Sequence, residues 1–310
     1  MKEKIICIVG PTASGKTSLS IELAKKINAE IISADSMQIY KGLDIGTAKV
    51  KEEEKQGVVH HIIDICNPNE KFSVADFKEL CYHKIDEILS KGKKVIIVGG
   101  TGLYVSAVVE DMNFENEDID VEYRNKLEKL AKEKSNEYLH EMLQKIDPKS
   151  AELIHKNNVK RVIRALEIAK NSKELKSTHM QKEMIRKKQE SKYDFYVFCL
   201  NIERELLYKR INERVDIMVK NGVIDEAKKL YDMNLDKTST CMQAIGYKEF
   251  FPYFEGKSTL DECIEKLKVE TRKYSKRQMT WFKNKLSPYF LDGTDDKNIL
   301  ICEILNVLNN

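Results

Sequence analysis

The residues whose chemistry is easiest to recognise lie near the amino terminus. The segment GPTASGKT, residues 10–17, matches the pattern G-x-x-x-x-G-K-[ST], and it lies between a β-branched run and an amphipathic stretch, as a phosphate-binding loop requires. Its glycines let backbone N–H groups point inward around a diphosphate, Lys16 adds a positive charge, and the Thr17 hydroxyl can bind Mg²⁺. The expected diphosphate-binding residues are Gly10, Pro11, Thr12, Ala13, Ser14, Gly15, Lys16 and Thr17. The alternative is a plain glycine-rich turn, and the pattern does not say what the diphosphate carries.

A second feature is the absence, at its usual position, of an acidic residue that proteins with this class of loop normally have. Nucleoside triphosphatases place an acidic residue at the end of a second apolar strand, where it organises Mg²⁺ and water. The best candidate strand here, KKVIIVGG at residues 93–100, is followed by Thr101 and Gly102. A hydroxyl and small glycines suit hydrogen bonding to a substrate better than they suit phosphate hydrolysis. We therefore expect a diphosphate other than that of ATP.

A carboxylate follows a different strand. Asp35 ends the run EIISAD, at the carboxyl edge of the expected sheet, where doubly wound folds bind their ligands. Ser36, Met37 and Gln38 follow it and suit contact with a base or a sugar. Facing the loop across a cleft, Asp35 could act as a general base, and the alternative is a turn or cap residue. Asp64, inside the run HHIIDIC, is instead expected to be buried and structural.

These residues must be positioned by alternating strands and helices. Strand-like runs at 4–10, 30–36, 60–66 and 93–100 are separated by helical or polar sequence, which indicates a parallel sheet with helices on both faces. Residues 112–192 contain no convincing strand and many Lys, Glu and Leu at helical spacing, with Pro148 at a helix boundary. We therefore predict an α/β fold with a P-loop NTPase-like parallel sheet core, formed by residues 1–111 and 193–310, and a helical insertion domain at 112–192.

The second half of the predicted core holds a further strand and two long helices. YDFYVFCLNI returns to a strand pattern at 193–202, and RELLYKRINERVDIMVKNG follows as a helix. Residues 258–285 form a long helix with one apolar stripe, which comprises Leu260, Ile264, Leu267, Tyr274 and Trp281. Trp281 is therefore expected in the core, and Glu52, Glu53 and Glu54 on a solvated helical turn.

Composition bounds the class of protein. The chain has 310 residues, of which 42% are hydrophobic and 33% charged, and its formal net charge is +3. Its seven cysteines are scattered, without a C-x-x-C pair, as in a reducing compartment, and His60 and His61 have no partner at metal-ligand spacing. No signal peptide and no apolar run of about 20 residues is present, so we expect a cytoplasmic protein without a membrane span.

Positive charge gathers in two segments. Residues 173–192 carry seven basic side chains against three acidic ones, and residues 266–285 carry eight against Glu270 alone. In the second segment Lys273 and Arg277 are four residues apart, beside the apolar stripe, which leaves a charged helix face free for phosphate contacts. A charge run can also be a solvated face, and this alternative is stronger for residues 173–192.

Nine segments, taken in order, resemble one known family. GPTASGKT, ISADSMQIYKGLDIGTAK, HHIIDI, FSVADF, VGGTGLY, KRVIRALEI, RVDIMVKNG, QAIGYKE and TRKYSKRQMTWFK are similar to segments of the tRNA dimethylallyltransferases, also called IPP transferases, over nearly the whole chain. The sequence after the last segment has no Cys/His zinc finger of the kind that eukaryotic members commonly add, so the bacterial type fits better.

The resemblance implies a function and a set of residues. In that family the loop binds dimethylallyl diphosphate with Mg²⁺, and the dimethylallyl group is transferred to N6 of adenosine 37 in tRNAs reading codons that begin with U. Asp35, Thr101 and Arg214 match the catalytic residues, and the diphosphate leaves intact, which accounts for the missing acid. The partner would be the tRNA anticodon stem-loop, and the enzyme a monomer. The implied tRNA contacts are Asp35, Ser36, Met37, Gln38, Thr101, Arg124, Lys160, Arg161, Val162, Ile163, Arg164, Cys241, Gln243, Gly246, Lys276 and Arg277.

Three alternatives remain open from the residues themselves. A small-molecule or nucleotide kinase would share the loop, an Asp after the second strand and an arginine-bearing helix with Arg204, Arg210 and Arg214. An adenylate isopentenyltransferase would prenylate a free nucleotide. Neither needs a long helical insertion or a basic carboxyl-terminal helix for a small substrate. A non-catalytic nucleic-acid-binding protein would leave Asp35 and Thr101 without a role.

Overall fold

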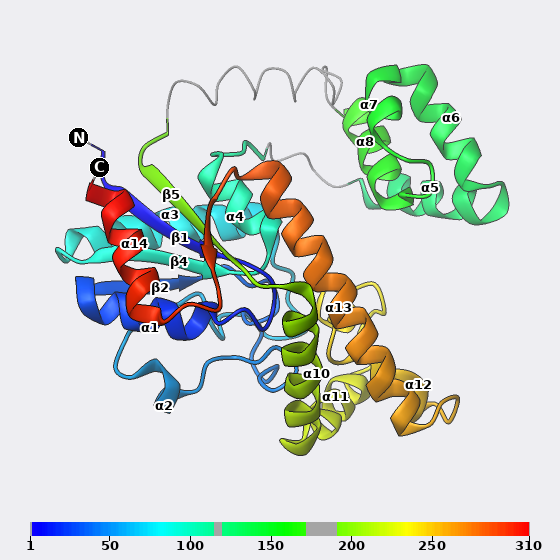
Figure 1. Ribbon diagram of the computed structural model, residues 1–310. Helices are drawn as coiled ribbons and strands as arrows, with labels where there is room; N and C mark the ends of the chain where they lie inside the picture. The colour runs from blue at the N-terminus through cyan, green and yellow to red at the C-terminus, as the bar shows by residue number, and fades with distance from the viewer. Residues whose placement is uncertain (1, 115–119, 172–190, 310) are drawn as a thin grey trace. The chain divides into compact units, whose positions relative to one another are not determined.

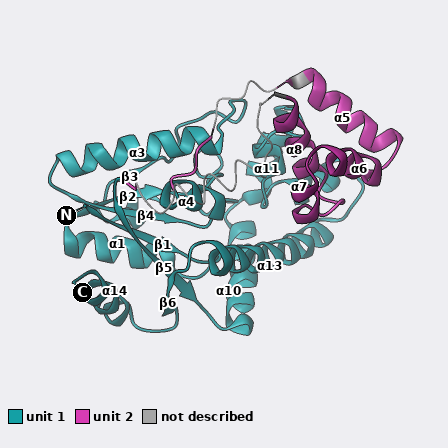
Figure 2. Cartoon of the chain, turned by 90° about the horizontal axis from the view of Figure 1, so that it is seen from above, with its two compact units in different colours: residues 1–110, 192–310 teal, residues 111–191 magenta. Residues whose placement is uncertain are grey.

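The computed structural model describes residues 2–114, 120–171 and 191–309. The chain divides into two compact units. Unit 1 comprises Met1–Glu110 and Lys192–Asn310, and unit 2 comprises Asp111–Ser191 (Figure 2). Two separate stretches of sequence therefore build unit 1.

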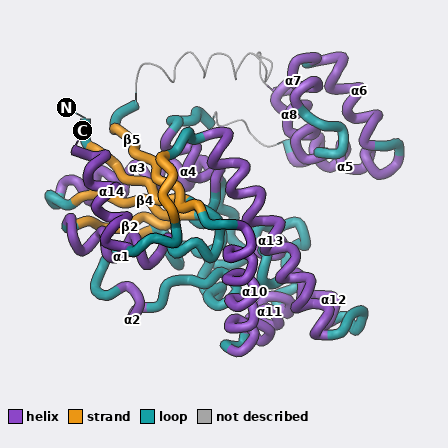
Figure 3. Tube along the Cα trace, viewed as in Figure 1, coloured by secondary structure: helices purple, strands orange, loops and turns teal. Residues whose placement is uncertain are grey.

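Unit 1 is built on a six-stranded parallel sheet with the strand order β3-β2-β4-β1-β5-β6 (Figure 3). The central strand β1 pairs with β4 on one side and β5 on the other, so that Val9 lies beside both Gly99 and Cys199. The segments that follow β1, β2 and β4 therefore leave the same edge of the sheet, and they carry residues 10–17, Asp35 and Thr101. The strands are β1 (Lys4–Val9), β2 (Ala29–Ser33), β3 (His60–His61), β4 (Lys94–Gly99), β5 (Asp194–Asn201) and β6 (Tyr289–Asp292).

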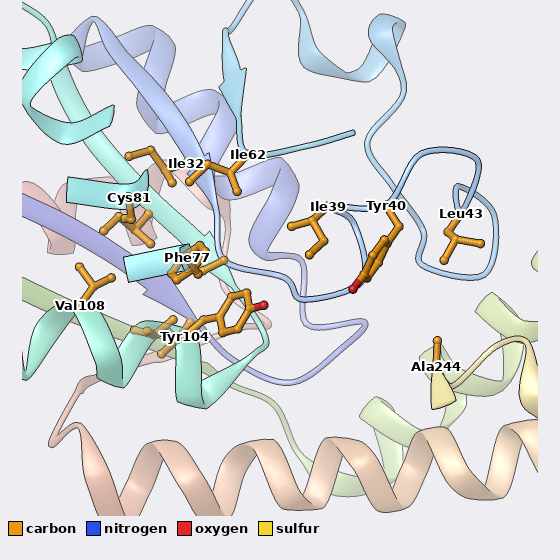
Figure 4. Packing of buried hydrophobic residues seen from close by; sticks show 14 of the residues in the cluster. Ile32, Ile39, Tyr40, Leu43, Ile62, Phe77, Cys81, Tyr104, Val108 and Ala244 are labelled. Carbon is orange, nitrogen blue, oxygen red and sulfur yellow. The ribbon is translucent and has the colours of Figure 1, made fainter. Parts of the chain in front are cut away.

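Both faces of the sheet are covered by helices, which explains why its strands are almost continuously apolar. On one face, α1 (Lys16–Ile27) and α14 (Lys297–Asn309) pack on outward-facing residues such as Ile6 and Ile8. On the other face lie α3 (Val74–Ser90) and α4 (Gly102–Val109). There Phe77 and Tyr104 stack with ring centroids 4.2 Å apart, beside Cys81 and Val108 (Figure 4).

The remaining helices of unit 1 extend beyond the sheet (Figure 1). The helices α10 and α13 pack against each other, with Arg272 donating to the Asn212 side chain at 2.6 Å and Lys268 pairing with Asp216 at 2.9 Å. The other helices are short and lie in the connections. The bounds are α2 (Glu52–Lys55), α10 (Arg204–Lys220), α11 (Val223–Asp232), α12 (Phe251–Phe254) and α13 (Leu260–Lys285), with 3₁₀ turns at Cys241–Gln243 and Lys248–Phe250.

Unit 2 has a hydrophobic core of its own, formed by residues that include Leu127, Leu139 and Leu166. Asp147 ends one helix and caps the next, because its carboxylate accepts from the backbone N–H of Ser150 at 3.1 Å and from the Ser150 hydroxyl at 2.7 Å. The helix boundary expected at Pro148 is confirmed. The helices are α5 (Val121–Glu133), α6 (Asn136–Ile146), α7 (Pro148–Leu153) and α8 (Val159–Asn171).

Two expectations about the core need correction. The strand predicted over 60–66 covers only His60–His61, because Ile62 and Asp64 adopt left-handed backbone conformations with φ of 61° and 56°. Asp64 is also not buried: its side chain is 46% exposed and pairs with Lys49 at 2.5 Å. The structure further shows β6 and α14 in residues 286–310, for which the sequence patterns had predicted no element.

Other expectations are met. Residues 52–55 form an exposed helical turn, and α13 matches the predicted long helix closely. All seven cysteines are free thiols, of which Cys302 is exposed and the other six are buried. Within the described ranges, the helices are all too short or too polar to cross a membrane.

Candidate active site

The phosphate-binding loop connects β1 to α1 and has the backbone conformation its sequence demands. Gly10 and Gly15 have φ of 148° and 90°, and Ala13 between them has φ of 63°. At Gly10 a Cβ atom would also lie 3.0 Å from the backbone oxygen of Leu200, so glycine lets the loop pass close to β5. The helix α1 begins at Lys16, so its first N–H groups, which have no intrahelical acceptor, belong to the loop. These groups form the frame of an anion site.

Two partly buried cations and one carboxylate dominate the electrostatics. The pKa of Lys16 is lowered to about 8, first by desolvation and then by the positive charge of Arg214, while Asp35 acts in the opposite direction. The pKa of Arg214, on α10, is also lowered by burial, again opposed by Asp35. The Lys16 ammonium donates to the backbone oxygen of Pro11 at 2.6 Å. The site therefore has an excess of positive charge that an anion would neutralise.

Asp35 lies just beyond β2, as predicted, and its carboxylate has one oxygen committed. Its Oδ1 accepts from the backbone N–H of Met37 at 2.9 Å. For the other oxygen the described residues supply no hydrogen bond. Thr101 reaches the same segment from the end of β4: its hydroxyl accepts from the N–H of Ser36 at 3.0 Å and donates to the Ser36 hydroxyl at 3.3 Å. Asp35 is thus both a turn residue and a carboxylate with a free oxygen, and Thr101 fixes its segment.

These groups surround a pocket of about 280 Å³ that is lined entirely by residues of unit 1. One part is apolar and lies where α10 and α13 approach each other, with Val215, Met218 and Leu267. Another is polar and includes Asp35 and Lys16. Of the residues expected at the site, those in the pocket wall are Thr12, Lys16, Thr17, Asp35, Ser36, Met37, Gln38, Arg214, Gln243 and Gly246. The pocket can hold a small anionic molecule with an apolar group beside a carboxylate.

Comparisons with known proteins now decide the family. The model of the IPP transferase family matches residues 38–285, which is most of the chain. The chain belongs to the IPP transferase family. It is 52% identical over 290 residues to a tRNA dimethylallyltransferase of Acetivibrio thermocellus, covering 94% of this chain and 92% of that one. It is 50% identical over 298 residues to a tRNA dimethylallyltransferase of Bacillus velezensis, with coverage of 96% and 93%.

Solved structures agree with this assignment. The full-length tRNA isopentenylpyrophosphate transferase of Bacillus halodurans is 48% identical and superposes with a TM-score of 0.74, covering 99% of this chain and 96% of that chain. A eukaryotic dimethylallyltransferase, in structures that show it acting on tRNA, is 32% identical with a TM-score of 0.81, covering 94% and 74%. The α/β core with a parallel sheet, predicted from the sequence, is therefore the fold of this IPP transferase.

Some residues expected to contact tRNA are turned inward in this IPP transferase. Val162 and Ile163 are 0% and 4% exposed and belong to the core of unit 2, so their side chains have no surface to offer RNA. Cys241 is 1% exposed, and its thiol donates to the backbone oxygen of Pro68 at 3.0 Å. The side chains of these three residues are therefore part of the packed interior, and their contact with tRNA stays a prediction.

The charged members of the same set are arranged differently. Lys160, Arg161, Lys276 and Arg277 are exposed. Arg124 is held by two hydrogen bonds, from its Nε and Nη2 atoms to the carboxylate of Glu167 at 2.6 and 2.8 Å, and Arg164 lies 3.6 Å from the same carboxylate. Of the basic segment 173–192, all but the last two residues lie outside the described residues. Lys192 pairs with Asp86 at 2.7 Å.

Three site residues were missed by sequence reasoning. Tyr274 was assigned to an apolar stripe, yet it lines the pocket, and burial beside Asp35 raises its pKa to about 12. Gln278, one turn further along α13, bonds to the phosphate-binding loop. Glu226 accepts hydrogen bonds from the backbone N–H groups of Asp44, Ile45 and Gly46, in a loop of the pocket wall. The only signal was a pair of polar groups four residues apart on α13, and nothing in the sequence showed that this helix would reach the loop.

The residues present fit Mg²⁺ as a ligand shared with a diphosphate. Among the described residues there is no group of three or more His, Cys, Asp or Glu side chains that could hold a metal ion by itself. Thr17, at the start of α1, lines the pocket together with Asp35. Mg²⁺ commonly takes one or two protein oxygens and completes its shell with water and phosphate oxygens. His61 instead donates from Nε2 to the carboxylate of Glu30 at 2.6 Å.

Proposed function

We propose that this IPP transferase moves the dimethylallyl group of dimethylallyl diphosphate to N6 of adenosine 37, in tRNAs reading codons that begin with U, and releases diphosphate. The observation that carries the proposal is one pocket in which Lys16 and Arg214, both partly buried, lie in the field of Asp35. The cations suit a leaving diphosphate and the carboxylate suits an amine that must lose a proton. The curated relatives named tRNA dimethylallyltransferase support the same reaction.

The proposed chemistry assigns one step to each group. The bond from the allylic carbon to the diphosphate oxygen breaks, the bond from that carbon to N6 forms, and a proton leaves N6. The lone pair of this amine is delocalised into the adenine ring, so it is a poor nucleophile, and Asp35 accepts its proton through the uncommitted oxygen. Lys16 and Arg214 stabilise the charge that develops on the diphosphate. Mg²⁺, held by Thr17 and the diphosphate oxygens, would supply further positive charge there.

The proposed partner is the anticodon stem-loop of tRNA, bound by a monomeric enzyme in the cytoplasm. The target base must leave the stack of the loop before it can enter the pocket, which costs a few kcal/mol. Contacts from exposed side chains such as Lys160, Arg161, Lys276 and Arg277 would offset that cost. Arg124 would act with them only after it gives up part of its bond to Glu167.

A nucleotide kinase is the second candidate, and the relatives do not favour it. Its case rests on the phosphate-binding loop, the Asp after the second strand and the arginine-bearing helix α10. The strand β4 ends at Gly99, and the residues after it supply the Thr101 hydroxyl where a triphosphatase would place an acid. An adenylate isopentenyltransferase would leave the exposed cations of α13 and unit 2 without a substrate to bind.

The deciding experiment supplies the protein with dimethylallyl diphosphate, Mg²⁺ and unmodified tRNA, digests the tRNA and identifies its nucleosides by mass spectrometry. We expect one adenosine per tRNA to gain the mass of a dimethylallyl group. Parallel reactions contain ATP in place of the prenyl donor, or AMP in place of tRNA. Phosphoryl transfer from ATP at enzymatic rates would support the kinase, and prenylated AMP without prenylated tRNA would support the free-nucleotide enzyme.

A further inference from the structure

The long helix α13 contacts the phosphate-binding loop through one buried amide. Gln278 is 5% exposed. Its Oε1 accepts from the backbone N–H of Thr12 at 2.9 Å, and its Nε2 donates to the backbone oxygen of Gly100 at 2.8 Å. A donor faces one end of the amide and an acceptor faces the other, so only one orientation of the side chain satisfies both. Gln278 therefore bridges the loop that follows β1 and the turn that follows β4.

The turn after β4 is shaped to receive this amide. A Cβ atom at Gly100 would lie 2.3 Å from Nε2 of Gln278, so no larger residue fits while the amide stays in place. One turn further along α13, Trp281 lies against Gly102, where a Cβ atom would be 2.3 Å from the indole ring. The indole N–H of Trp281 donates to the Ser106 hydroxyl at 2.9 Å. The helix is thus fixed to α4 at one point and to both catalytic segments at another.

The bridge joins groups that must act together. Thr12 is in the loop assigned to the diphosphate, and Gly100 precedes Thr101, which holds the segment of Asp35. Because the Thr12 N–H is bonded to Gln278, it is not free to bind a phosphate, and the N–H groups of residues 13–17 are left for that role. A small change in the relative position of donor and base costs reaction rate steeply.

We propose that Gln278 is a positioning residue of the prenyl transfer: it holds the diphosphate-binding loop and the turn that carries Thr101 in fixed register. The inference rests on the proposed function for its kinetic consequence, but its effect on anion binding does not depend on tRNA. Gln278 touches neither reacting atom in this account. It acts through Thr12 and Gly100.

The test compares three substitutions with a matched control. Gln278→Met keeps the length of the side chain and removes both hydrogen bonds. Gln278→Glu keeps an acceptor for Thr12 and places an oxygen against the oxygen of Gly100. Gly100→Ala leaves Gln278 in the sequence and pushes its amide away. The control, Ser106→Ala, removes the hydrogen bond by which Trp281 ties α13 to α4. Calorimetry measures the Kd of inorganic pyrophosphate with Mg²⁺, kinetics measure kcat and KM for dimethylallyl diphosphate at saturating tRNA, and thermal unfolding measures Tm.

We expect Gln278→Met and Gly100→Ala to raise the Kd of pyrophosphate about tenfold and to lower kcat by about 10- to 100-fold. Gln278→Glu should raise the Kd most, because it adds negative charge beside the anion. Ser106→Ala should lower Tm while its Kd and kcat stay within about twofold of those of the wild type.

Two results would overturn the proposal. One is a folded Gln278→Met protein with reduced Tm and unchanged Kd and kcat, because this result would show that Gln278 has a structural role only. The other is an equal loss of pyrophosphate affinity in Ser106→Ala, since that is a general loosening of α13. If Gln278→Met does not fold, Gly100→Ala decides the question by the same criteria. A wild-type protein that transfers nothing to tRNA would contradict the proposed function and leave the pyrophosphate result to be judged alone.

Discussion

At the scale of single residues, the pocket holds two partly buried cations. The positive charge of Arg214 lowers the pKa of Lys16, desolvation lowers the pKa of both groups, and Asp35 acts in the opposite direction on both. A dianionic ligand completes this set of charges better than water does, because charge–charge attraction strengthens as the surroundings become less polar. Binding and protonation of Lys16 are therefore linked.

The linkage gives a pH dependence of known sign. The pKa of Lys16 in the free protein is about 8, so below that pH the ammonium is present before the anion arrives. Above it the free protein must take up a proton to bind, and the Kd of pyrophosphate should rise by up to about tenfold per pH unit. Calorimetry from pH 6.5 to 9.5 measures this, with Lys16→Arg as the control that stays charged. Identical pH profiles for the two proteins would contradict the assignment, because the ionisation of pyrophosphate itself is common to both.

Asp35 permits a test that separates its two roles. Asp35→Asn keeps an oxygen for the Met37 N–H and removes the base, whereas Asp35→Ala removes both. We expect both to lower kcat by about 10²-fold or more, and only Asp35→Ala to lower Tm. Steady-state kinetics and thermal unfolding make the comparison. Near-normal kcat in Asp35→Asn would leave Asp35 with the turn role alone.

Whether a site residue can be predicted from the sequence depends on whether a local pattern places it or a contact between segments far apart along the chain. The positions of residues 10–17, Asp35 and Thr101 follow from local patterns, because each comes directly after a strand of one parallel sheet. Tyr274 and Gln278 do not, since α13 reaches the loop from more than 250 residues away along the chain. The burial of Val162 and Ile163 was not foreseen because the motif was transferred as a block, while helical periodicity turns these two side chains inward.

At the scale of elements, the pocket wall depends on a carboxylate on α11. Glu226 accepts from the backbone N–H groups of Asp44, Ile45 and Gly46 at 2.9–3.0 Å and from the Tyr247 hydroxyl at 2.6 Å. Gly46, Thr47 and Ala48 of this loop line the pocket. At Gly46 a Cβ atom would lie 2.6 Å from the ring of Tyr247, so the loop and the ring are in close contact. Three donors from successive residues satisfy one anion.

Replacing that carboxylate should loosen the wall. In Glu226→Gln an amide NH₂ group would face N–H donors that it cannot accept from, and we expect a loss of about 1–3 kcal/mol in the free energy of unfolding together with a raised KM for the prenyl donor. Urea unfolding and steady-state kinetics measure the two. The control is Asp232→Asn, which breaks an exposed ion pair with Lys228 on the same helix and should cost less than about 1 kcal/mol. Equal losses in both variants would contradict a special role for Glu226.

The exposed face of α13 is the second element with a testable role. Lys273 is paired with Glu270 at 2.8 Å, so Lys276 and Arg277 are expected to contribute most to RNA binding. Replacing Lys273, Lys276 and Arg277 by Ala should weaken tRNA binding and reduce the slope of log K against log salt by about 0.7–0.9 per lost phosphate contact. Turnover at saturating tRNA should change much less.

A control that removes two positive charges elsewhere tests where that effect arises. Lys25 and Lys26 are exposed near the end of α1, at the edge of the sheet opposite the phosphate-binding loop. Replacing both by Ala also lowers the net charge, and it should leave the salt slope unchanged. If the triple variant keeps the wild-type slope, α13 does not face the RNA, and the binding falls to unit 2.

At the scale of the whole molecule, the binding pocket and the inserted helices are separable in principle. Every residue that lines the pocket belongs to unit 1, and unit 2 has its own core. The alternation of strands and helices predicted a parallel sheet. It could not supply the order of the strands, because β1 pairs with β4, which precedes the insertion in the sequence, and with β5, which follows it. Only the three-dimensional packing shows that β1, the strand before the phosphate-binding loop, is central in the sheet.

This separation predicts the outcome of a deletion. Replacing residues 112–190 by a flexible Gly/Ser linker of about 15 residues should leave pyrophosphate binding within about threefold of the wild type, because no lining residue is lost. Prenyl transfer to tRNA should fall at least about tenfold, since the exposed cations of α8 are removed. Calorimetry and the nucleoside assay measure the two. Full transfer by the shortened protein would show that unit 2 contributes nothing to tRNA binding.

The central place of β1 also has a consequence for synthesis. The strand leaves the ribosome well before its partner on one side, β5, which starts at Asp194, the residue that pairs with Lys4. At about 5–20 residues per second, the nascent chain waits on the order of 10–40 s between the two. During that time β1 to β4 can assemble around α1. The apolar strand β1 is then an edge of the sheet, and its backbone donors and acceptors on that side are unpaired. Such an edge can pair with other chains. Nascent chains stalled before residue 194 should therefore bind chaperones that recognise extended apolar segments, and chains stalled well past β5 should release them.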